Sequence, residues 1–209
     1  VLSKYPIIAN GAIKLTTETF NYSDPRSFFA QIAPIHGGRI AQKVKIKIGG
    51  REIVVYNTHL ESICGPSGRL AQYRQIKDDA EHEEDPAIIL GDFNTCGHGL
   101  AKWFSEESIY SIKKWFRRTL AGNDPLLRAM KWRKTEAELW DHLEFDNDDV
   151  DGFFDPFDRK EPTLRIRPFF KGKLDWTLFR KGEFQVNHNA IGPYGLSDHR
   201  PLIVQAQLL

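Results

Sequence analysis

The chain has 209 residues, of which 41% are hydrophobic, and its formal net charge is +1. This length suits one well-buried domain, and no linker rich in proline, serine and glycine divides it, which excludes a string of small modules. The near-zero charge excludes a global electrostatic attraction to nucleic acid, so any basic binding surface has to be local.

The first third of the chain predicts mainly β-structure. Residues 1–15 read as two short apolar strands with a turn at Pro6, and residues 16–38 are irregular. Lysines alternate with aliphatic residues over 43–48, and a second apolar run follows Gly49-Gly50, which predicts a β-hairpin. We interpret the three lysines as a solvated sheet face or a protected edge rather than as a phosphate-binding stripe.

A helix is predicted after this hairpin. Ser67 can cap it, and apolar residues recur at helical spacing to about His82. Arg69 and Gln72, three residues apart near its start, could face a cleft, but we interpret them as surface residues. Residues 87–90 are short and fully apolar, as a buried central strand would be.

Residues 97–170 form the least regular portion of the chain. Basic residues and two tryptophans, Trp115 and Trp132, are interleaved over 113–134. They fit either a grip on a polyanionic substrate or two amphipathic helices with solvated faces. We favour the helices, because acidic residues follow at once. The acidic stretch 147–158 partly imitates a calcium-binding loop, but a proline interrupts it, so we predict a solvated loop.

The two cysteines, Cys64 and Cys96, are too few for a disulfide framework. We expect free thiols in a reducing compartment, which favours a cytoplasmic location. No apolar run is long enough to span a bilayer, and the opening residues lack the pattern of a secretory signal.

Polar residues able to handle charge stand at the ends of several predicted strands. They form four motifs: Asn57-Thr58-His59-Leu60, Gly91-Asp92-Phe93-Asn94, Leu174-Asp175-Trp176 and Ser197-Asp198-His199. Because strand ends of this kind meet at one edge of a sheet, we expect a single site. In order and placement the motifs resemble the endonuclease/exonuclease/phosphatase superfamily, which includes DNase I-like nucleases, inositol polyphosphate phosphatases and tyrosyl-DNA phosphodiesterases. The sequence Thr-His-Leu-Glu-Ser at residues 58–62 most resembles that of bacterial members of unassigned substrate and of the tyrosyl-DNA phosphodiesterase branch.

The resemblance implies an α/β fold, the four-layered α/β sandwich of the DNase I-like type, in which two mixed sheets pack face to face with helices outside. It covers residues 1–209 as one domain, with a variable helical and acidic insertion at about 97–170. Family members carry, further upstream, a strand with an Asn and a Gln-Glu whose Glu is the principal magnesium ligand. Neither is present here, so we expect this chain to be the C-terminal portion of the domain, without its N-terminal strands.

The same resemblance assigns catalytic roles. His199 would be the general base, and Asp175 would accept from its other ring nitrogen and so fix the tautomer. Asp92 would position or help deprotonate the attacking water, Asn94 would donate to a phosphoryl oxygen, and His59 would bind the scissile phosphate.

For the metal site, the resemblance implies Asp198 as a magnesium ligand, with Asp92 and Asn94 beside it. The cofactor would be Mg²⁺, with Mn²⁺ as an alternative.

The leading function is therefore a magnesium-dependent phosphoesterase, and more specifically a phosphodiesterase, that hydrolyses a phosphate ester by in-line attack of an activated water. Nucleic acid is one candidate substrate beside phosphoinositides and phospholipid headgroups. An alternative is a truncated or inactive domain that binds a phosphate-containing ligand or partner without turnover. A histidine-liganded transition-metal hydrolase using His59 and His199 ranks last, because the histidines are not clustered in the sequence.

Overall fold

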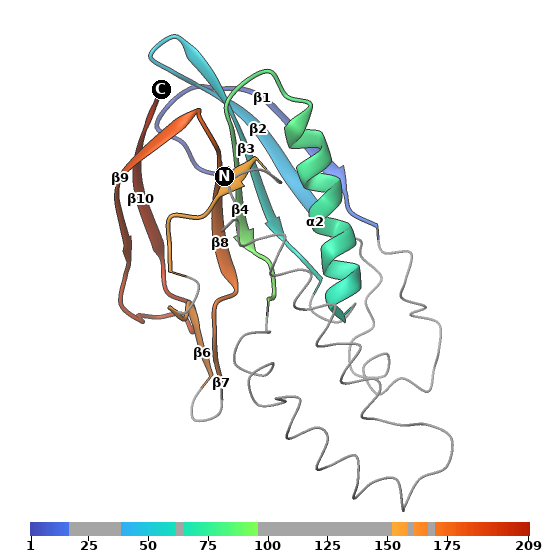
Figure 1. Cartoon of the computed structure of the whole chain (residues 1–209), viewed down its shortest axis with the longest axis vertical. Coiled ribbons are helices and arrows are strands. Elements are labelled where there is room, and N and C mark those ends of the chain that lie inside the picture. Colours follow the sequence, from blue (N-terminus) through green and yellow to red (C-terminus); the bar gives the residue numbers. More distant parts are fainter. Residues whose placement is uncertain (17–38, 62–64, 96–151, 159–160, 167–169) are drawn as a thin grey trace, which may run out of the picture.

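The structure, a computed structural model, describes residues 1–16, 39–61, 65–95, 152–158, 161–166 and 170–209 (Figure 1). The two cysteines, residues 147–151 of the acidic stretch and the basic segment over 113–134 lie outside these residues. In the described half of the acidic stretch Phe153 and Phe157 are buried, so the prediction of a solvated loop is wrong there. The elements are β1 (Ile7–Lys14), β2 (Ile40–Ile48), β3 (Arg51–His59), α2 (Gly65–Glu81), β4 (Ala87–Asp92), β5 (Phe153–Phe154), β6 (Leu164–Ile166), β7 (Phe170–Gly172), β8 (Asp175–Arg180), β9 (Phe184–Ile191) and β10 (Leu202–Leu208).

A six-stranded mixed sheet forms the centre of the described part, in the order β1-β2-β3-β4-β8-β5. The predicted hairpin is confirmed as β2 and β3, which pair antiparallel around Gly49 and Gly50, both at positive φ. Strands β3 and β4 are parallel, and β8 runs antiparallel to β4. Of the two strands predicted over 1–15, only the second forms, as the edge strand β1.

One face of this sheet packs against α2. Because strand side chains alternate between faces, Val54 and Tyr56 of β3 point to the helix, whose Tyr73 and Ile76 are fully buried against them. The apolar strand predicted at 87–90 is β4, in the middle of the sheet. Burial on both faces explains why its sequence is a continuous apolar run.

The other face packs against a second, two-stranded sheet, in which β9 and β10 pair antiparallel. Val44, Val55 and Phe179 of the large sheet meet Phe184 and Val204 of the small one in a second apolar cluster. Figure 1 shows the resulting order of layers, with β9 and β10 on the left, the large sheet in the middle and α2 on the right. The described residues thus form three of the four layers predicted.

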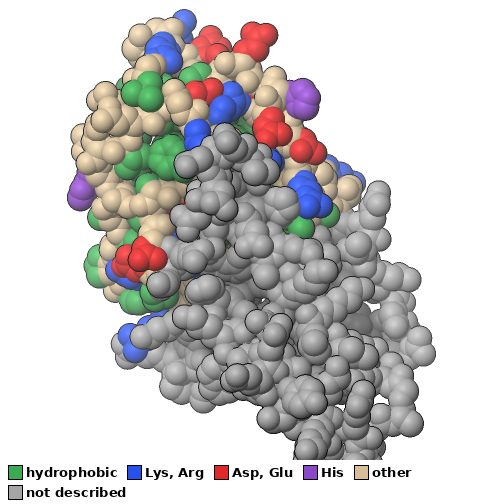
Figure 2. Space-filling model, viewed as in Figure 1, with side chains coloured by type: hydrophobic (Ala, Val, Ile, Leu, Met, Phe, Trp, Pro, Cys, Tyr) green, Lys and Arg blue, Asp and Glu red, His purple; other side chains and the backbone are tan. Residues whose placement is uncertain are grey.

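The interpretation of the lysines as a solvated face is wrong for two of them. Lys43 and Lys45 point to the side of the sheet that carries α2 and are partly buried. Lys43 lies 2.6 Å from the Asp79 carboxylate, Lys45 lies 2.9 Å from that of Asp85, and both also pair with Glu83. Figure 2 shows charges of both signs intermixed over the upper part of the described surface. The lysines thus attach the sheet to the last turn of α2 and to the acidic turn that follows it.

The helix differs from its prediction in two respects. It begins at Gly65, so Ser67 lies inside it instead of capping it. Arg69 and Gln72 are both only 2% exposed, and the Gln72 side-chain oxygen accepts from the Glu61 amide at 2.9 Å, so neither is a surface residue. Among the described residues, no helix is both long and apolar enough to cross a membrane.

Candidate active site

The strand pairing places three of the predicted residues in one row across the sheet. His59 ends β3 and is the register partner of Asp92, which ends the parallel strand β4. Asp92 is in turn the partner of Asp175, the first residue of the antiparallel strand β8. Two parallel strands that end together and an antiparallel one that begins there bring the three side chains to the same edge, as the sequence predicts.

Gly91 allows β4 to lie close to β3 at this edge. Its φ is +137°, and a β-carbon built on it would lie 1.9 Å from the Thr58 carbonyl oxygen. Only glycine fits such a backbone position without displacing the neighbouring strand. The glycine of the Gly91-Asp92 motif therefore sets how closely Asp92 approaches His59.

His199 reaches the row from the loop that precedes β10. Its Nδ1 lies 2.8 Å from Asp175 Oδ2, a hydrogen-bond distance, and its Nε2 lies 4.0 Å from Asp92 Oδ2. Asp92 Oδ2 is also 3.5 Å from His59 Nε2. The imidazole of His59 is 54% exposed, whereas His199 and the two carboxylates are partly buried. One carboxylate thus stands between two imidazoles.

Electrostatics at the site shift two pKa values. Burial raises the pKa of Asp92, and Asp175 raises it further, although a hydrogen bond from the Asn94 amide and the two imidazoles act in the opposite direction. Partial burial lowers the pKa of His199, but the hydrogen bond to Asp175 and the negative charges of Asp175, Asp92 and Asp198 outweigh it, so the net shift is upward. The site therefore favours a protonated His199 at higher pH than a free imidazole does.

The remaining two predicted residues lie less centrally. Asn94 has a left-handed backbone (φ 52°), its amide donates to Asp92 Oδ1 at 2.8 Å, and its side-chain nitrogen donates to the Leu60 carbonyl at 2.7 Å. In this arrangement Asn94 holds Asp92 and the end of β3. Asp198 is exposed and does not belong to the described cluster of close ligand atoms. The metal and phosphate roles of both residues stay predictions.

Thr163 is a supporting residue that no sequence pattern indicated. It is fully buried, and its hydroxyl oxygen accepts from the amides of Leu174 (2.9 Å) and Asp175 (3.1 Å). Its carbonyl accepts from the Arg200 amide at 2.8 Å. The residue is thus bound to the backbone on both sides of the Asp175–His199 pair. An isolated threonine in a loop gives no signal of such a role in the sequence.

Arg200, directly after His199, is a second supporting residue. Its guanidinium donates to the carbonyls of Gly192 (2.7 Å) and Ile191 (3.0 Å) and lies 3.2 Å from Glu161. These contacts join the loop carrying His199 to the end of β9 and to the segment before β6. An arginine adjacent to His199, the predicted general base, could have been suspected from the sequence, but its partners could not.

The donor set at this edge fits a divalent cation. Asp92, Asp175 and His199 each offer a ligand atom within 4.8 Å of one another. Carboxylate oxygens suit Mg²⁺ or Mn²⁺, and an imidazole nitrogen suits a transition metal. His199 Nδ1 and Asp175 Oδ2 already face each other across a hydrogen bond, and Asp92 Oδ1 accepts from the Asn94 amide. The ligand atoms that remain for a cation are Asp92 Oδ2, Asp175 Oδ1 and His199 Nε2.

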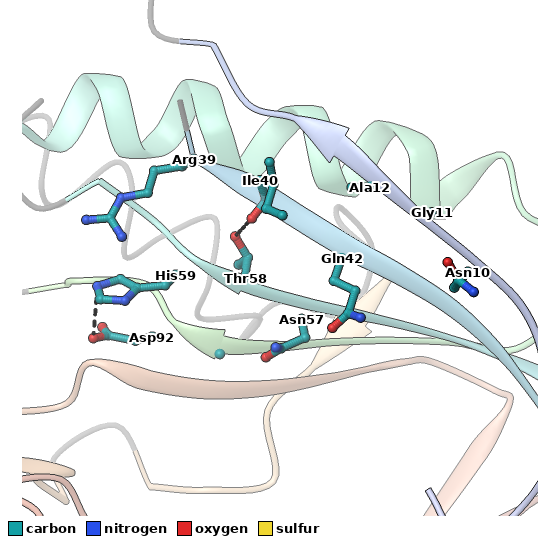
Figure 3. A pocket seen from close by; sticks show the side chains of 11 residues that line it. Asn10, Gly11, Ala12, Arg39, Ile40, Gln42, Asn57, Thr58, His59 and Asp92 are labelled. Carbon is teal, nitrogen blue, oxygen red and sulfur yellow. Dashed lines mark hydrogen bonds and ion pairs between the residues drawn. The ribbon is translucent and has the colours of Figure 1, made fainter. Parts of the chain in front are cut away.

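A pocket of about 800 Å³ begins at His59 and Asp92 and extends along β1, β2 and β3. Figure 3 shows Arg39 and His59 at the end near Asp92, and amide side chains farther along. Asn10, Gln42 and Asn57 supply those amides. The pocket therefore offers two basic side chains beside the carboxylate and neutral hydrogen-bonding groups away from it.

Comparison with known proteins supports one family. A model of the endonuclease/exonuclease/phosphatase family matches residues 1–199. A comparison with curated protein sequences found no match.

Solved structures with the same fold come from several organisms. An endonuclease/exonuclease/phosphatase from Bacteroides vulgatus has a TM-score of 0.57 and 19% identity over 99% of this chain and 67% of its own. The mannosyl-6-phosphatase Bt3783 of Bacteroides thetaiotaomicron has a TM-score of 0.51 and 16% identity, over 98% of this chain and 67% of its own. D. rerio TDP2, complexed with single-strand DNA product, has a TM-score of 0.52 and 14% identity, over 96% of this chain and 68% of its own. At such identities the likeness shows the fold, the DNase I-like α/β sandwich, and the chain spans about two thirds of each structure.

Proposed function

The chain belongs to the endonuclease/exonuclease/phosphatase family, and from that premise we propose that it hydrolyses a phosphate ester, specifically a phosphodiester, with Mg²⁺ as its cofactor. The family's name covers nucleases and phosphatases, which both break phosphate ester bonds. The observation that carries the proposal is the contact of His199 Nδ1 with Asp175 Oδ2 at 2.8 Å, with Asp92 within 4.0 Å of the other ring nitrogen.

Proton transfer is the task of the His199–Asp175 pair in this proposal. A carboxylate that accepts from Nδ1 holds the imidazole in the tautomer whose Nε2 is unprotonated. That nitrogen faces Asp92, so a water between the two groups could be oriented by the Asp92 carboxylate while it loses its proton to His199. This arrangement supplies the nucleophile of a phosphoryl transfer.

Phosphate binding is the task of His59. Its imidazole is the most exposed of the three side chains around Asp92, so it can reach a substrate. As a donor or a cation it would stabilise the charge that builds on the phosphoryl oxygens. Asn94 keeps its predicted role as a second donor here.

The donor set at Asp92 and Asp175 supports a cation that prefers oxygen ligands. Such a cation, when bound, neutralises charge on the phosphate and lowers the pKa of a coordinated water. Asp198 is proposed as a further ligand, because it stands next to His199 in the chain.

The test is the hydrolysis of bis(p-nitrophenyl) phosphate by this chain, with Mg²⁺, with Mn²⁺, with Zn²⁺ and with EDTA. We expect turnover that needs Mg²⁺ or Mn²⁺ and is lost in His199→Ala. Turnover with Zn²⁺ alone would favour a histidine-liganded hydrolase instead. No turnover with any metal, in a folded protein, would favour a domain that binds a phosphate-containing ligand without hydrolysing it.

The preference for a diester needs its own comparison. One of the similar structures is a mannosyl-6-phosphatase, whose substrate is a monoester, and another holds single-strand DNA. We therefore propose to compare kcat/KM for the aryl diester, p-nitrophenyl phosphate and a short single-stranded DNA. A higher kcat/KM for the monoester than for both diesters would contradict the diester assignment and leave the phosphoesterase assignment intact.

A further inference from the structure

Arg39 lines the pocket and contacts a buried carboxylate. The Glu61 side chain is only 3% exposed, and its Oε2 lies 3.2 Å from Arg39 Nε. Glu61 is itself fixed by its backbone amide, which donates to the side chain of Gln72 at 2.9 Å. The charge of the buried carboxylate attracts the guanidinium where water screens it little, so this contact restrains the direction of the arginine.

The contact uses only one edge of the guanidinium. In the part of the chain that the structure describes, Glu61 is the partner of the Arg39 side chain, and it is reached through Nε. The two terminal nitrogens are left to face outward, and the side chain is 31% exposed. Arg39 therefore keeps a fork of donors available on a side chain whose direction is restrained.

This fork belongs to the same pocket as the catalytic groups. Arg39 lines it together with His59 and Asp92. In Figure 3 the guanidinium and the His59 imidazole lie at the same end of the pocket, next to Asp92. The other lining side chains with polar groups are neutral apart from the Asp92 carboxylate, so the positive charge of the pocket is concentrated where the reaction would occur.

We propose that Arg39 binds the non-bridging oxygens of the substrate's phosphate and that Glu61 is the buried anchor that aims it. This inference rests on the proposed function and adds a binding residue to the same site. A guanidinium matches two phosphate oxygens with two parallel N–H donors, a geometry that neither His59 nor a lysine can offer. Arg39 thus contacts the non-bridging phosphate oxygens, whose negative charge increases in the transition state.

The simpler role for Arg39 would be to neutralise Glu61 and nothing more. The two roles separate when Glu61 is neutralised as well. Arg39→Gln alone removes the Arg39 contact of the buried Glu61 carboxylate and should lower the thermal midpoint in either case. The double variant Arg39→Gln/Glu61→Gln removes both charges, so it leaves no carboxylate for Arg39 to neutralise while it still lacks the fork.

The experiment measures inorganic phosphate binding by calorimetry, with and without Mg²⁺, which requires no turnover. We expect Arg39→Gln and the double variant to bind phosphate about tenfold to a hundredfold more weakly than the wild-type chain. Arg51→Gln is the matched control, because Arg51 lies at the start of β3, away from this pocket, and donates to the Leu209 carbonyl. It should bind phosphate as the wild type does.

A double variant that folds and binds phosphate as tightly as the wild type would overturn the proposal, and so would a wild-type chain with no saturable phosphate binding. If the wild type binds phosphate through Arg39 but hydrolyses none of the esters, the proposed function fails and the binding role of Arg39 stands.

Discussion

His199 and Asp175 come from different layers of the molecule and meet at a distance of 2.8 Å. Asp175 opens β8 of the large sheet, whereas His199 precedes β10 of the small one. The pair therefore forms only when the two sheets are packed against each other, and it reports on the correct assembly of the whole site.

Asp175→Asn should reduce kcat about a thousandfold, because an amide that donates to Nδ1 favours the wrong imidazole tautomer. KM should change little, since Asp175 is not expected to contact the substrate. Steady-state kinetics on the aryl diester would check this. A fall of less than about tenfold would mean that the orientation of His199 does not limit the reaction.

The pH dependence of that reaction should reflect the raised pKa of His199. A general base works only when it is unprotonated, so activity should fall as the pH drops through this pKa. The acidic limb should lie above the ordinary imidazole value of about 6.5. In Asp175→Asn the main cause of the upward shift is gone, and the limb should move to lower pH. If the acidic limb of the pH–activity profile does not move in this variant, the limb reports the titration of a group other than His199.

Thr163→Val should disturb the site through the backbone. Valine has the shape of threonine but leaves the amides of Leu174 and Asp175 without their acceptor, at a cost of about 1–3 kcal/mol in the free energy of unfolding. The low-field proton resonance of the His199 Nδ1–H should also weaken, because Asp175 is no longer held in place. Thr163→Ser keeps the hydroxyl and should restore the resonance. Retention of this resonance in the valine variant would limit Thr163 to a role in stability.

Gly91→Ala should destabilise the protein by about 3 kcal/mol or more, because a methyl group would clash with the Thr58 carbonyl at a positive φ. Gly11→Ala is the control, since a β-carbon there meets nothing within 4 Å. Urea unfolding of both variants gives the comparison. Equal losses would show that the close approach of β3 and β4 is not the cause.

Acid should weaken the contact between the sheet and α2. Burial alone would raise the pKa of Asp79, but hydrogen bonds from Lys43 and Tyr56 outweigh it and lower the pKa below 3.8. A carboxyl with a lowered folded-state pKa adds stability above its unfolded pKa and loses it as the pH falls through the folded value. Asp79→Asn should therefore cost about 0.5–1 kcal/mol at neutral pH and progressively less below about pH 4.

Urea unfolding at both pH values would measure this difference. Asp78→Asn is the control, because Asp78 is exposed on the same helix turn. A cost for Asp79→Asn that stays constant with pH would show that packing, and not the charge, is lost.

Much of the architecture could be predicted because it depends on the local periodicity of apolar residues. The alternation of lysines with aliphatic residues predicted β2, the paired glycines predicted the turn, and the apolar run at 87–90 predicted the central strand β4. What periodicity could not supply was the partner of each polar face. The pattern of Lys43 and Lys45 is that of a solvated face, whereas their partners are Asp79 at the end of α2 and Asp85 in the turn that follows it.

The same distinction between local pattern and tertiary contact applies to the predicted site. The sequence by itself determined which residue types stand at strand ends, and His59, Asp92 and Asp175 meet as expected because strand pairing carries them to one edge. His199 joins them from the loop before β10, through the packing of the two sheets. Only the tertiary structure decided that Asn94 turns toward Leu60, that Thr163 holds Asp175, and that Glu61 aims Arg39 into the pocket. Those contacts join residues far apart in the chain, and their chemistry depends on burial and direction, which no local pattern of residues encodes.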